Sequence, residues 1–160
     1  MESPTFRNQF IRPVNKKDLE CLRIWKNKYK KYFFFQKNIS LEDQLEWYEN
    51  YLKRENDYMF AVMGPDSTMI GCMGIRLNEA DQSWDIYNVI GGSASHRGLG
   101  LMSAALREMI NFALDKQNII VQLVVVRGNP AIQWYARNGF KEINKEGLGV
   151  VMYFSPDKFS

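Results

Sequence analysis

Apolar and polar positions alternate with two different periods, and the change of period divides the chain into a helical first third and a strand-rich remainder. After a short strand at residues 9–14, apolar side chains recur every three or four residues. This spacing predicts one helix up to about residue 30 and a second over 41–52. Asn15 and Ser40 precede these helices, and each is followed three residues later by an aspartate, which is the spacing of a helix cap.

From residue 58 onward the apolar residues come in short runs bounded by glycine, proline and asparagine, which is typical of strands. The expected strands cover residues 58–63, 68–77, 84–90, 119–126, 141–145 and 150–154. Two helices are expected between them, over residues 101–116 and 131–137. The run at 119–126 is almost unbroken, and this pattern indicates a strand that is covered on both faces.

This order of elements predicts an α+β fold in a single domain over residues 1–160, with its core at about 9–154. We expect a mixed, mostly antiparallel central sheet flanked by helices, with one β-α-β crossover. The two C-terminal strands would leave an edge that suits a homodimer.

Composition excludes several classes of site. The 160 residues are 46% hydrophobic, enough for a core, and contain two cysteines and one histidine. That rules out a disulfide scaffold and makes a cysteine- or histidine-built metal site implausible, so no metal is expected. No signal peptide or membrane segment is visible, so we expect a cytoplasmic protein with no membrane partner.

The net charge of +3 conceals an uneven distribution. Residues 12–37 hold nine lysines and arginines and two acids, a local excess of +7, together with several aromatic residues. This segment is either a solvated lysine-rich helix face or a surface that meets an anionic ligand. Acids are spread through the rest of the chain and no single-strand-binding pattern appears, so no nucleic-acid partner is expected.

A glycine-bearing loop joins the strand at 84–90 to the helix at 101–116. It contains the run Ser95-His96-Arg97-Gly98-Leu99-Gly100-Leu101-Met102. The first turn of a helix has unpaired N–H groups, glycines allow a phosphate to approach them, and an arginine adds a cation, so the loop suits a pyrophosphate. A pair of glycines can also make only a tight turn, and His96 suits a phosphate contact or a surface position.

A second motif follows about 30 residues later. It consists of Val124-Val125-Val126-Arg127-Gly128-Asn129-Pro130-Ala131, then Tyr135, then Gly139-Phe140. Together with the loop at residues 97–100, and in this order, it resembles the GNAT superfamily of acetyl-CoA-dependent N-acetyltransferases. The resemblance extends to the order of elements from residue 9 to residue 154.

The resemblance implies the GNAT fold. It also implies that acetyl-CoA is the co-substrate and that its acetyl group is transferred directly to an amine. It implies a binding site for CoA made by Val89, Ile90, Arg97, Gly98, Leu99, Gly100, Leu101, Met102 and Asn129. Tyr135 would be the general acid toward the CoA sulfur, although a core tyrosine is the alternative, and Asn129 could instead cap the next helix. Asp85 would be the base, or else a solvated acid near a strand end. Cys72 is a weaker candidate for an acyl-carrying nucleophile.

The resemblance also places the first two helices on the acceptor side. Trp25 and Tyr87 are the expected contacts to a small amine acceptor, and the basic segment would suit an anionic one. An amino sugar or a nucleotide-linked amino sugar fits this description. The alternatives are a protein or peptide amine, or an acyl-CoA-binding protein without catalysis.

Overall fold

The structure, a computed structural model, describes residues 10–93 and 100–155. Within them, seven strands form one sheet in the order β1-β2-β3-β4-β5-β7-β6. The strands are β1 (Ile11–Pro13), β2 (Asp57–Met63), β3 (Met69–Asn78), β4 (Ser83–Gly91), β5 (Ile120–Val126), β6 (Phe140–Glu146) and β7 (Gly149–Phe154). Neighbouring strands are antiparallel except β4 and β5, which are parallel and are connected through α3 (Leu101–Lys116). The predicted α+β fold with one crossover is confirmed.

The first helix is shorter than its periodicity predicted. The other helices of the described chain are η1 (Lys16–Asp18), α1 (Leu19–Lys28), η2 (Lys30–Tyr32), α2 (Leu41–Leu52) and α4 (Ala131–Arg137). Both predicted caps form complete capping boxes, at Asn15 and at Ser40. Asn15 caps the 3-10 turn η1 rather than α1 itself, so the α-helix begins one turn later than the cap suggested. Of the described helices, none is long and apolar enough to cross a membrane.

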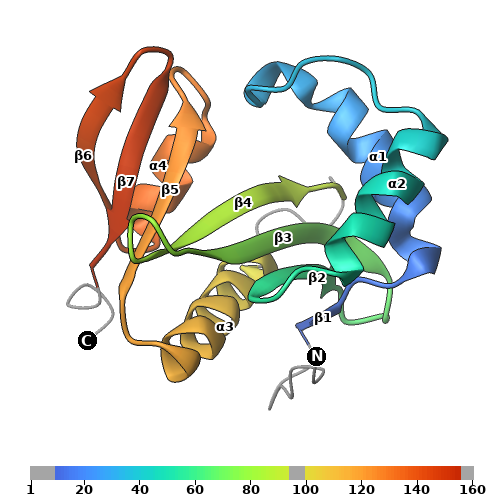
Figure 1. Ribbon diagram of the computed structural model, residues 1–160, viewed down its shortest axis with the longest axis horizontal. Helices are drawn as coiled ribbons and strands as arrows, with labels where there is room; N and C mark the ends of the chain where they lie inside the picture. The colour runs from blue at the N-terminus through green and yellow to red at the C-terminus, as the bar shows by residue number, and fades with distance from the viewer. Residues whose placement is uncertain (1–9, 94–99, 156–160) are drawn as a thin grey trace.

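Strand β2 shows how the two faces of the sheet are covered. Its side chains alternate between two clusters, with Tyr58, Phe60 and Val62 in the cluster that includes α3 residues. Met59 and Ala61 belong to the cluster beneath α1 and α2. Figure 1 shows this arrangement, with α3 on one side of the sheet and α1 and α2 on the other. Because both faces are covered, β2 is buried over almost its whole length.

Strand β5 differs from the prediction, because only one of its faces is covered. Val121, Leu123 and Val125 are buried with α3, whereas Ile120 and Val124 are 50% and 49% exposed. The helices α1 and α2 pack on β2, β3 and the end of β4, and the described helices leave that face of β5 open. The expectation of a strand covered on both faces is therefore wrong.

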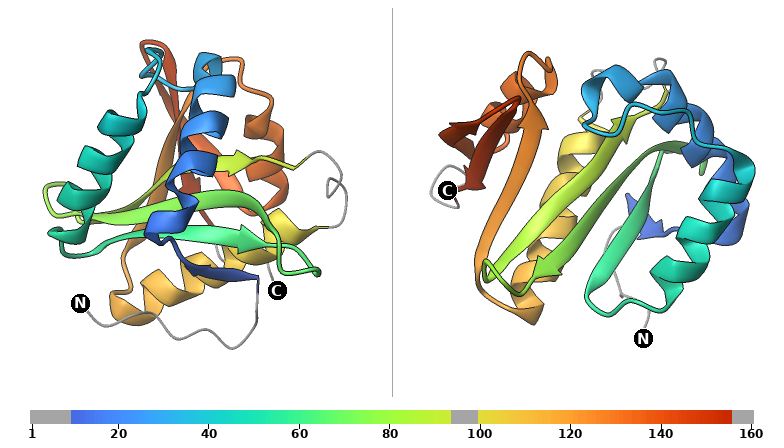
Figure 2. Two further views of the ribbon diagram at one scale, coloured as in Figure 1. Left: turned by 90° about the vertical axis from the view of Figure 1, so that its right-hand side faces the viewer. Right: turned by 45° about the horizontal axis from the view of Figure 1, so that its top comes forward.

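The strands β4 and β5 separate along their length. Their ladder begins at Ser83 opposite Ile120 and ends at Ile86 opposite Leu123. Beyond this point β4 remains paired with β3, and β5 with β7. The divergence is visible in the right-hand view of Figure 2, and it leaves the backbone groups of β4 that face β5 without a strand partner.

Candidate active site

A cavity of about 620 Å³ lies where β4 and β5 separate. Most of its wall comes from the end of α1 with the aromatic segment after it, the second half of β4, β5, and the start of α4. Trp47 of α2 and Arg76 of β3 complete the lining. Six residues predicted for the site line it: Asp85, Tyr87, Val89, Ile90, Asn129 and Tyr135. Gln122 and Val124 on the open face of β5 also line this cavity.

A β-bulge bends β4 at the floor of the cavity. Cys72 of β3 pairs with Ile90 and Gly74 pairs with Tyr87, so β4 carries one residue more than β3 between these pairs. Asn88 takes up the extra length with a φ of 52°, a left-handed conformation that is uncommon outside glycine and that asparagine adopts more readily than most residues. Such a conformation persists only when its surroundings hold it in place.

The bulge is held by contacts from two other elements. The Lys26 ammonium of α1 donates a hydrogen bond to the Asn88 side-chain oxygen at 2.5 Å. The Cys72 thiol donates to the Asn88 carbonyl oxygen at 3.3 Å. Burial raises the pKa of Cys72 to about 12, so its sulfur stays protonated and acts as a donor rather than as a nucleophile.

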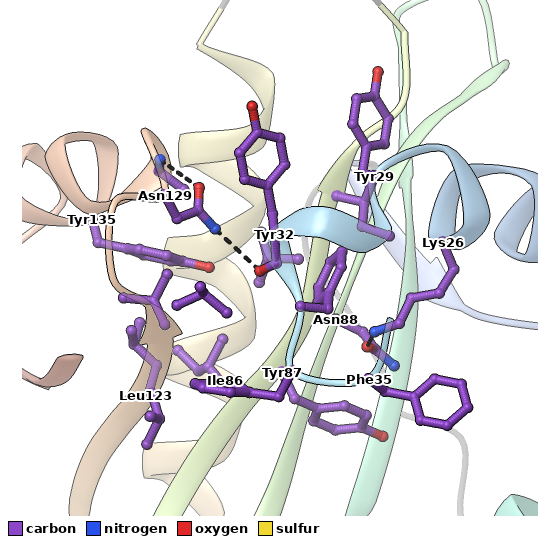
Figure 3. A pocket seen from close by; sticks show the side chains of 18 of the residues that line it. Lys26, Tyr29, Tyr32, Phe35, Ile86, Tyr87, Asn88, Leu123, Asn129 and Tyr135 are labelled. Carbon is purple, nitrogen blue, oxygen red and sulfur yellow. Dashed lines mark hydrogen bonds between the residues drawn. The ribbon is translucent and has the colours of Figure 1, made fainter. Parts of the chain in front are cut away.

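The phenol of Tyr135 points into the cavity from α4 (Figure 3). Its ring is held edge-on between Trp134 and Phe140, at centroid distances of 5.1 and 5.7 Å. Burial raises the pKa of Tyr135 above its ordinary value, so the hydroxyl is protonated at neutral pH. A rigid, protonated phenol facing a cavity has the properties of a general acid.

Asn129 joins α4 to the N-terminal helices. Its side-chain oxygen accepts a hydrogen bond from the backbone N–H of Ala131 at 2.9 Å, as the capping interpretation predicted. Its amide nitrogen donates to the Tyr32 carbonyl oxygen at 3.5 Å. Asn129 therefore connects the two sides of the cavity at its rim, where Figure 3 shows both bonds.

Asp85 lies at the closed end of the cavity, and its carboxylate is already engaged. One oxygen accepts from the Ser83 hydroxyl and the Gln122 amide, each at 2.8 Å. The other accepts from the Asn78 amide at 2.9 Å. The Gln122 bond connects β4 to β5 within their short ladder, one pair before the strands separate, and the Asn78 bond connects β4 to β3.

Tyr87 contributes its ring to the cavity while its hydroxyl points elsewhere. The hydroxyl donates a hydrogen bond to the buried carboxylate of Asp57, and the guanidinium of Arg76 lies 4.4 Å from the ring centroid. Burial, followed by the charge of Asp57, raises the pKa of Tyr87 far above its ordinary value. Tyr87 is therefore a fixed, neutral wall of the cavity.

Lys26 is a residue of the cavity that the sequence analysis did not single out. Its ammonium lies 3.6 Å from the centroid of the Phe33 ring, besides donating to Asn88. Burial lowers the pKa of Lys26 to about 8. The sequence did contain a signal: Lys26 follows Leu22 by four residues and precedes Tyr29 by three, which places it on the inner face of α1.

A second cavity, of about 410 Å³, adjoins the first beneath α1 and α2. Gln44 of α2 lines it and is 7% exposed. Trp25, predicted to contact the substrate, lines neither cavity and lies against the backbone of Gly92. The aromatic residues shared by both cavities are Phe35 and Trp47 instead.

The predicted phosphate loop is described only at its end. Arg97, Gly98 and Leu99 lie outside the described residues. Gly100 precedes α3 with a left-handed φ of 72°, which explains the need for glycine there. Leu101 and Met102 form the first turn, whose N–H groups have no partners within the helix.

The bulk of Met102 is accommodated by the sheet. A methyl group added to Gly71 of β3 would lie only 2.6 Å from the Met102 sulfur. The Met102 side chain therefore packs under β3, and a glycine at position 71 makes room for it. Among the described residues, no group of three histidine, cysteine, aspartate or glutamate side chains could hold a metal ion.

Comparisons with known proteins agree with this architecture. Residues 9–141 match the family model described as "Acetyltransferase (GNAT) domain". Spermidine N-acetyltransferase from Vibrio cholerae, solved with CoA and spermine, is similar at 20% identity and a TM-score of 0.77, over 93% of this chain and 96% of that one. FdhC, described as a nucleotide-linked sugar GNAT, is similar at 20% identity and a TM-score of 0.76, over 99% and 92%. The search of curated proteins gave no significant match.

Proposed function

The chain belongs to the GNAT family of acetyltransferases, and we propose that it transfers the acetyl group of acetyl-CoA to the primary amine of an amino sugar or a nucleotide-linked amino sugar. The observation that carries this proposal is the cavity between β4 and β5, with a protonated phenol on one wall and a basic, aromatic wall opposite.

The separated strands suit the arm of acetyl-CoA. Beyond Ile86 the backbone groups of β4 that face β5 have no strand partner, and preorganised donors of this kind can bind an amide or a thioester oxygen. Val89 and Ile90 supply these groups. The N–H groups of Leu101 and Met102 at the start of α3, with Gly100 and the preceding Arg97, Gly98 and Leu99, would receive the pyrophosphate.

Tyr135 is the proton donor in this proposal. The transfer forms a bond between the amine nitrogen and the acetyl carbon and breaks the bond from that carbon to sulfur. The leaving sulfur needs a proton, which Tyr135 supplies from inside the cavity. Asp85 is assigned a positioning role, because its two oxygens already accept hydrogen bonds from Asn78 of β3, Ser83 of β4 and Gln122 of β5.

The acceptor side favours a ring-bearing, oxygen-rich amine. Phe35 and Trp47 provide flat surfaces where the two cavities meet, and the Gln44 amide can bond to a hydroxyl or carbonyl group. A linear polyamine carries several positive charges and would need free carboxylates. The carboxylates in the walls are Asp43 and Asp85, and each accepts hydrogen bonds already. The likeness to a protein described as a nucleotide-linked sugar GNAT also supports this acceptor class.

Two measurements test the proposal. Acetyl-CoA should raise the melting temperature, because a ligand that binds only the folded state stabilises it. Release of CoA should then be measured with UDP- and dTDP-linked amino sugars, free amino sugars, spermidine and peptides. We expect turnover with an amino sugar. Turnover confined to spermidine or to peptides would contradict the acceptor class, and a melting shift without any turnover would favour a non-catalytic acyl-CoA-binding protein.

A variant tests the role of Tyr135. Tyr135→Phe should lower kcat by at least about tenfold while leaving acetyl-CoA binding unchanged, because it removes only the proton donor. Tyr153→Phe, which makes the same change on β7 outside both cavities, is the control and should be as active as the native protein. An unchanged kcat in Tyr135→Phe would remove this residue from the mechanism.

A further inference from the structure

We propose that Lys26 is the general base of the reaction and that its ε-amine removes the proton from the attacking acceptor nitrogen. The inference rests on the proposed function, because it assigns a step of that same acetyl transfer. It is carried by the position of Lys26 between the two cavities, by its hydrogen bond to Asn88 and by the lack of another free base in the walls.

Lys26 lies where the two cavities meet. Tyr135 and the separated part of β4 line the larger cavity, and Gln44 of α2 lines the smaller. The residues common to both walls are Lys26, Phe35, Trp47, Asn88 and Ile90. If the thioester occupies the larger cavity and the body of the acceptor the smaller, the attacking nitrogen passes this junction, and Lys26 is the titratable group there.

The surroundings of Lys26 suit a base that exchanges protons near neutral pH. Loss of hydration lowers its pKa to about 8, although the Asn88 oxygen, the Phe33 ring face and the nearby Cys72 favour the charged form. The titratable or charged groups that line the two cavities with it are Tyr29, Tyr32, Asp43, Cys72, Arg76, Asp85, Tyr87 and Tyr135. In the neutral amine, one N–H still donates to Asn88 while the nitrogen lone pair is free to accept a proton.

The other candidates for the base are engaged or protonated. The Asp85 carboxylate accepts bonds from three side chains at the closed end of the cavity. Asp43 accepts the backbone N–H of Ser40 as part of a helix cap. Burial keeps the Cys72 and Tyr87 groups protonated. Among the wall residues that the structure describes, Lys26 is therefore the amine at the junction of the two cavities, and burial lowers its pKa to about 8.

The proton balance of the step is complete. As the new carbon–nitrogen bond forms, the acceptor nitrogen gives a proton to the Lys26 amine, which becomes an ammonium. As the carbon–sulfur bond breaks, Tyr135 gives its proton to the sulfur, and CoA leaves as a thiol. Lys26 then loses its proton to water and Tyr135 regains one from water, so the enzyme ends in its starting state.

Direct titration of the lysines tests the proposal without any acceptor. With lysines labelled by ¹³C next to the amine, the Lys26 resonance should titrate with a midpoint near 8, as for a desolvated amine. Lys28, on the exposed side of the same helix, provides the reference resonance in the same titration. A Lys26 midpoint within about half a unit of that of Lys28 would overturn the proposal.

Kinetics separates a base from a group that merely binds anions. Lys26→Met and Lys26→Arg should each lower kcat/KM at least about a hundredfold and abolish the rise in rate that passes through its midpoint near pH 8. Lys28→Met is the control and should be unaffected. The loss in Lys26→Met should shrink with an aromatic amine, which is unprotonated at neutral pH and needs less help from a base.

The outcomes distinguish the two proposals. If the native protein acetylates no amine, the proposed function fails and the assignment of a base fails with it. If the native protein is active and Lys26→Arg is equally active, Lys26 is a bound cation and the base assignment alone is overturned. Binding of acetyl-CoA by Lys26→Met, measured by calorimetry, should equal that of the native protein, and a large loss there would show that Lys26 only supports the bulge.

Discussion

Strands β2 and β5 are each seven residues long and mostly apolar, yet they have opposite roles in the molecule. The helices cover both faces of β2, so its run of apolar residues is core throughout. One face of β5 is core, while Val124 and Gln122 on the other face line the larger cavity. A mostly apolar run thus corresponds to burial on both faces in β2, and to one buried face and one cavity-lining face in β5.

The difference follows from where the helices can pack. The pair α1 and α2 packs on β2, β3 and the end of β4, and the separation of β4 from β5 creates an open wedge next to it. Exposing the apolar residues on the open face of β5 to water costs the fold little stability. These residues offer an apolar surface to the arm of a bound cofactor. The same composition therefore contributes to stability in one half of the sheet and, by our proposal, to binding in the other.

The largest expected difference is in the free energy of unfolding lost when one valine in each strand is shortened to alanine. Val62 in β2 is fully buried, and Val62→Ala should lower the free energy of unfolding by about 2–3 kcal/mol, through lost burial and the cavity left behind. Val124 in β5 is 49% exposed, and Val124→Ala should lower it by less than about 0.5 kcal/mol. Urea denaturation measures both values. Equal losses in the two variants would show that the open face of β5 is closed in solution.

A charge on the open face of β5 should affect binding more than folding. Val124→Glu introduces a carboxylate into the wall of the cavity and should raise the dissociation constant for acetyl-CoA about tenfold, equivalent to about 1.4 kcal/mol. Ile143→Glu places the same charge at an exposed apolar site on β6, outside both cavities. Calorimetry should show native affinity for the Ile143 variant, and equal affinities in both variants would remove β5 from the binding wall.

Local patterns were sufficient to predict most of the fold. The caps at Asn15 and Ser40, the helix after Gly100 and the turn-bounded strands depend on neighbouring residues, and the structure confirms them. The coverage of β5 could not be predicted in the same way. It depends on how far α1 and α2 extend across the sheet, which is a property of packing between distant segments.

The site residues that belong to a sequence motif could be predicted. Those brought into the site by long-range contacts could not. Tyr135 and Asn129 follow one another in a recognisable segment, and the structure brings both to the cavity. Lys26 is one of nine basic residues within 26 positions, and only its contact with Asn88, 62 residues away, distinguishes it. No glycine or proline marks the bulge at Asn88, and an asparagine, although it tolerates a positive φ, does not by itself predict one within a strand.

The smallest expected effect on stability and binding comes from the helix-covered half of the sheet, where a second cavity lies beneath α1 and α2. Gln44 on α2 is buried and lines the smaller cavity, so Gln44→Leu replaces a polar wall residue by an apolar one of similar size. The free energy of unfolding should stay the same or rise slightly, because burying an apolar side chain avoids the cost of removing an amide from water. If the acceptor bonds to this amide, its KM should rise about fivefold, equivalent to the roughly 1 kcal/mol of one hydrogen bond, while the KM for acetyl-CoA stays constant. Gln133→Leu, on the exposed side of α4, controls for the change of residue type. A Gln44→Leu variant that is less stable but has a native KM would show instead that the cavity beneath α1 and α2 is a packing defect, and that the helix-covered half of the sheet takes no part in binding the acceptor.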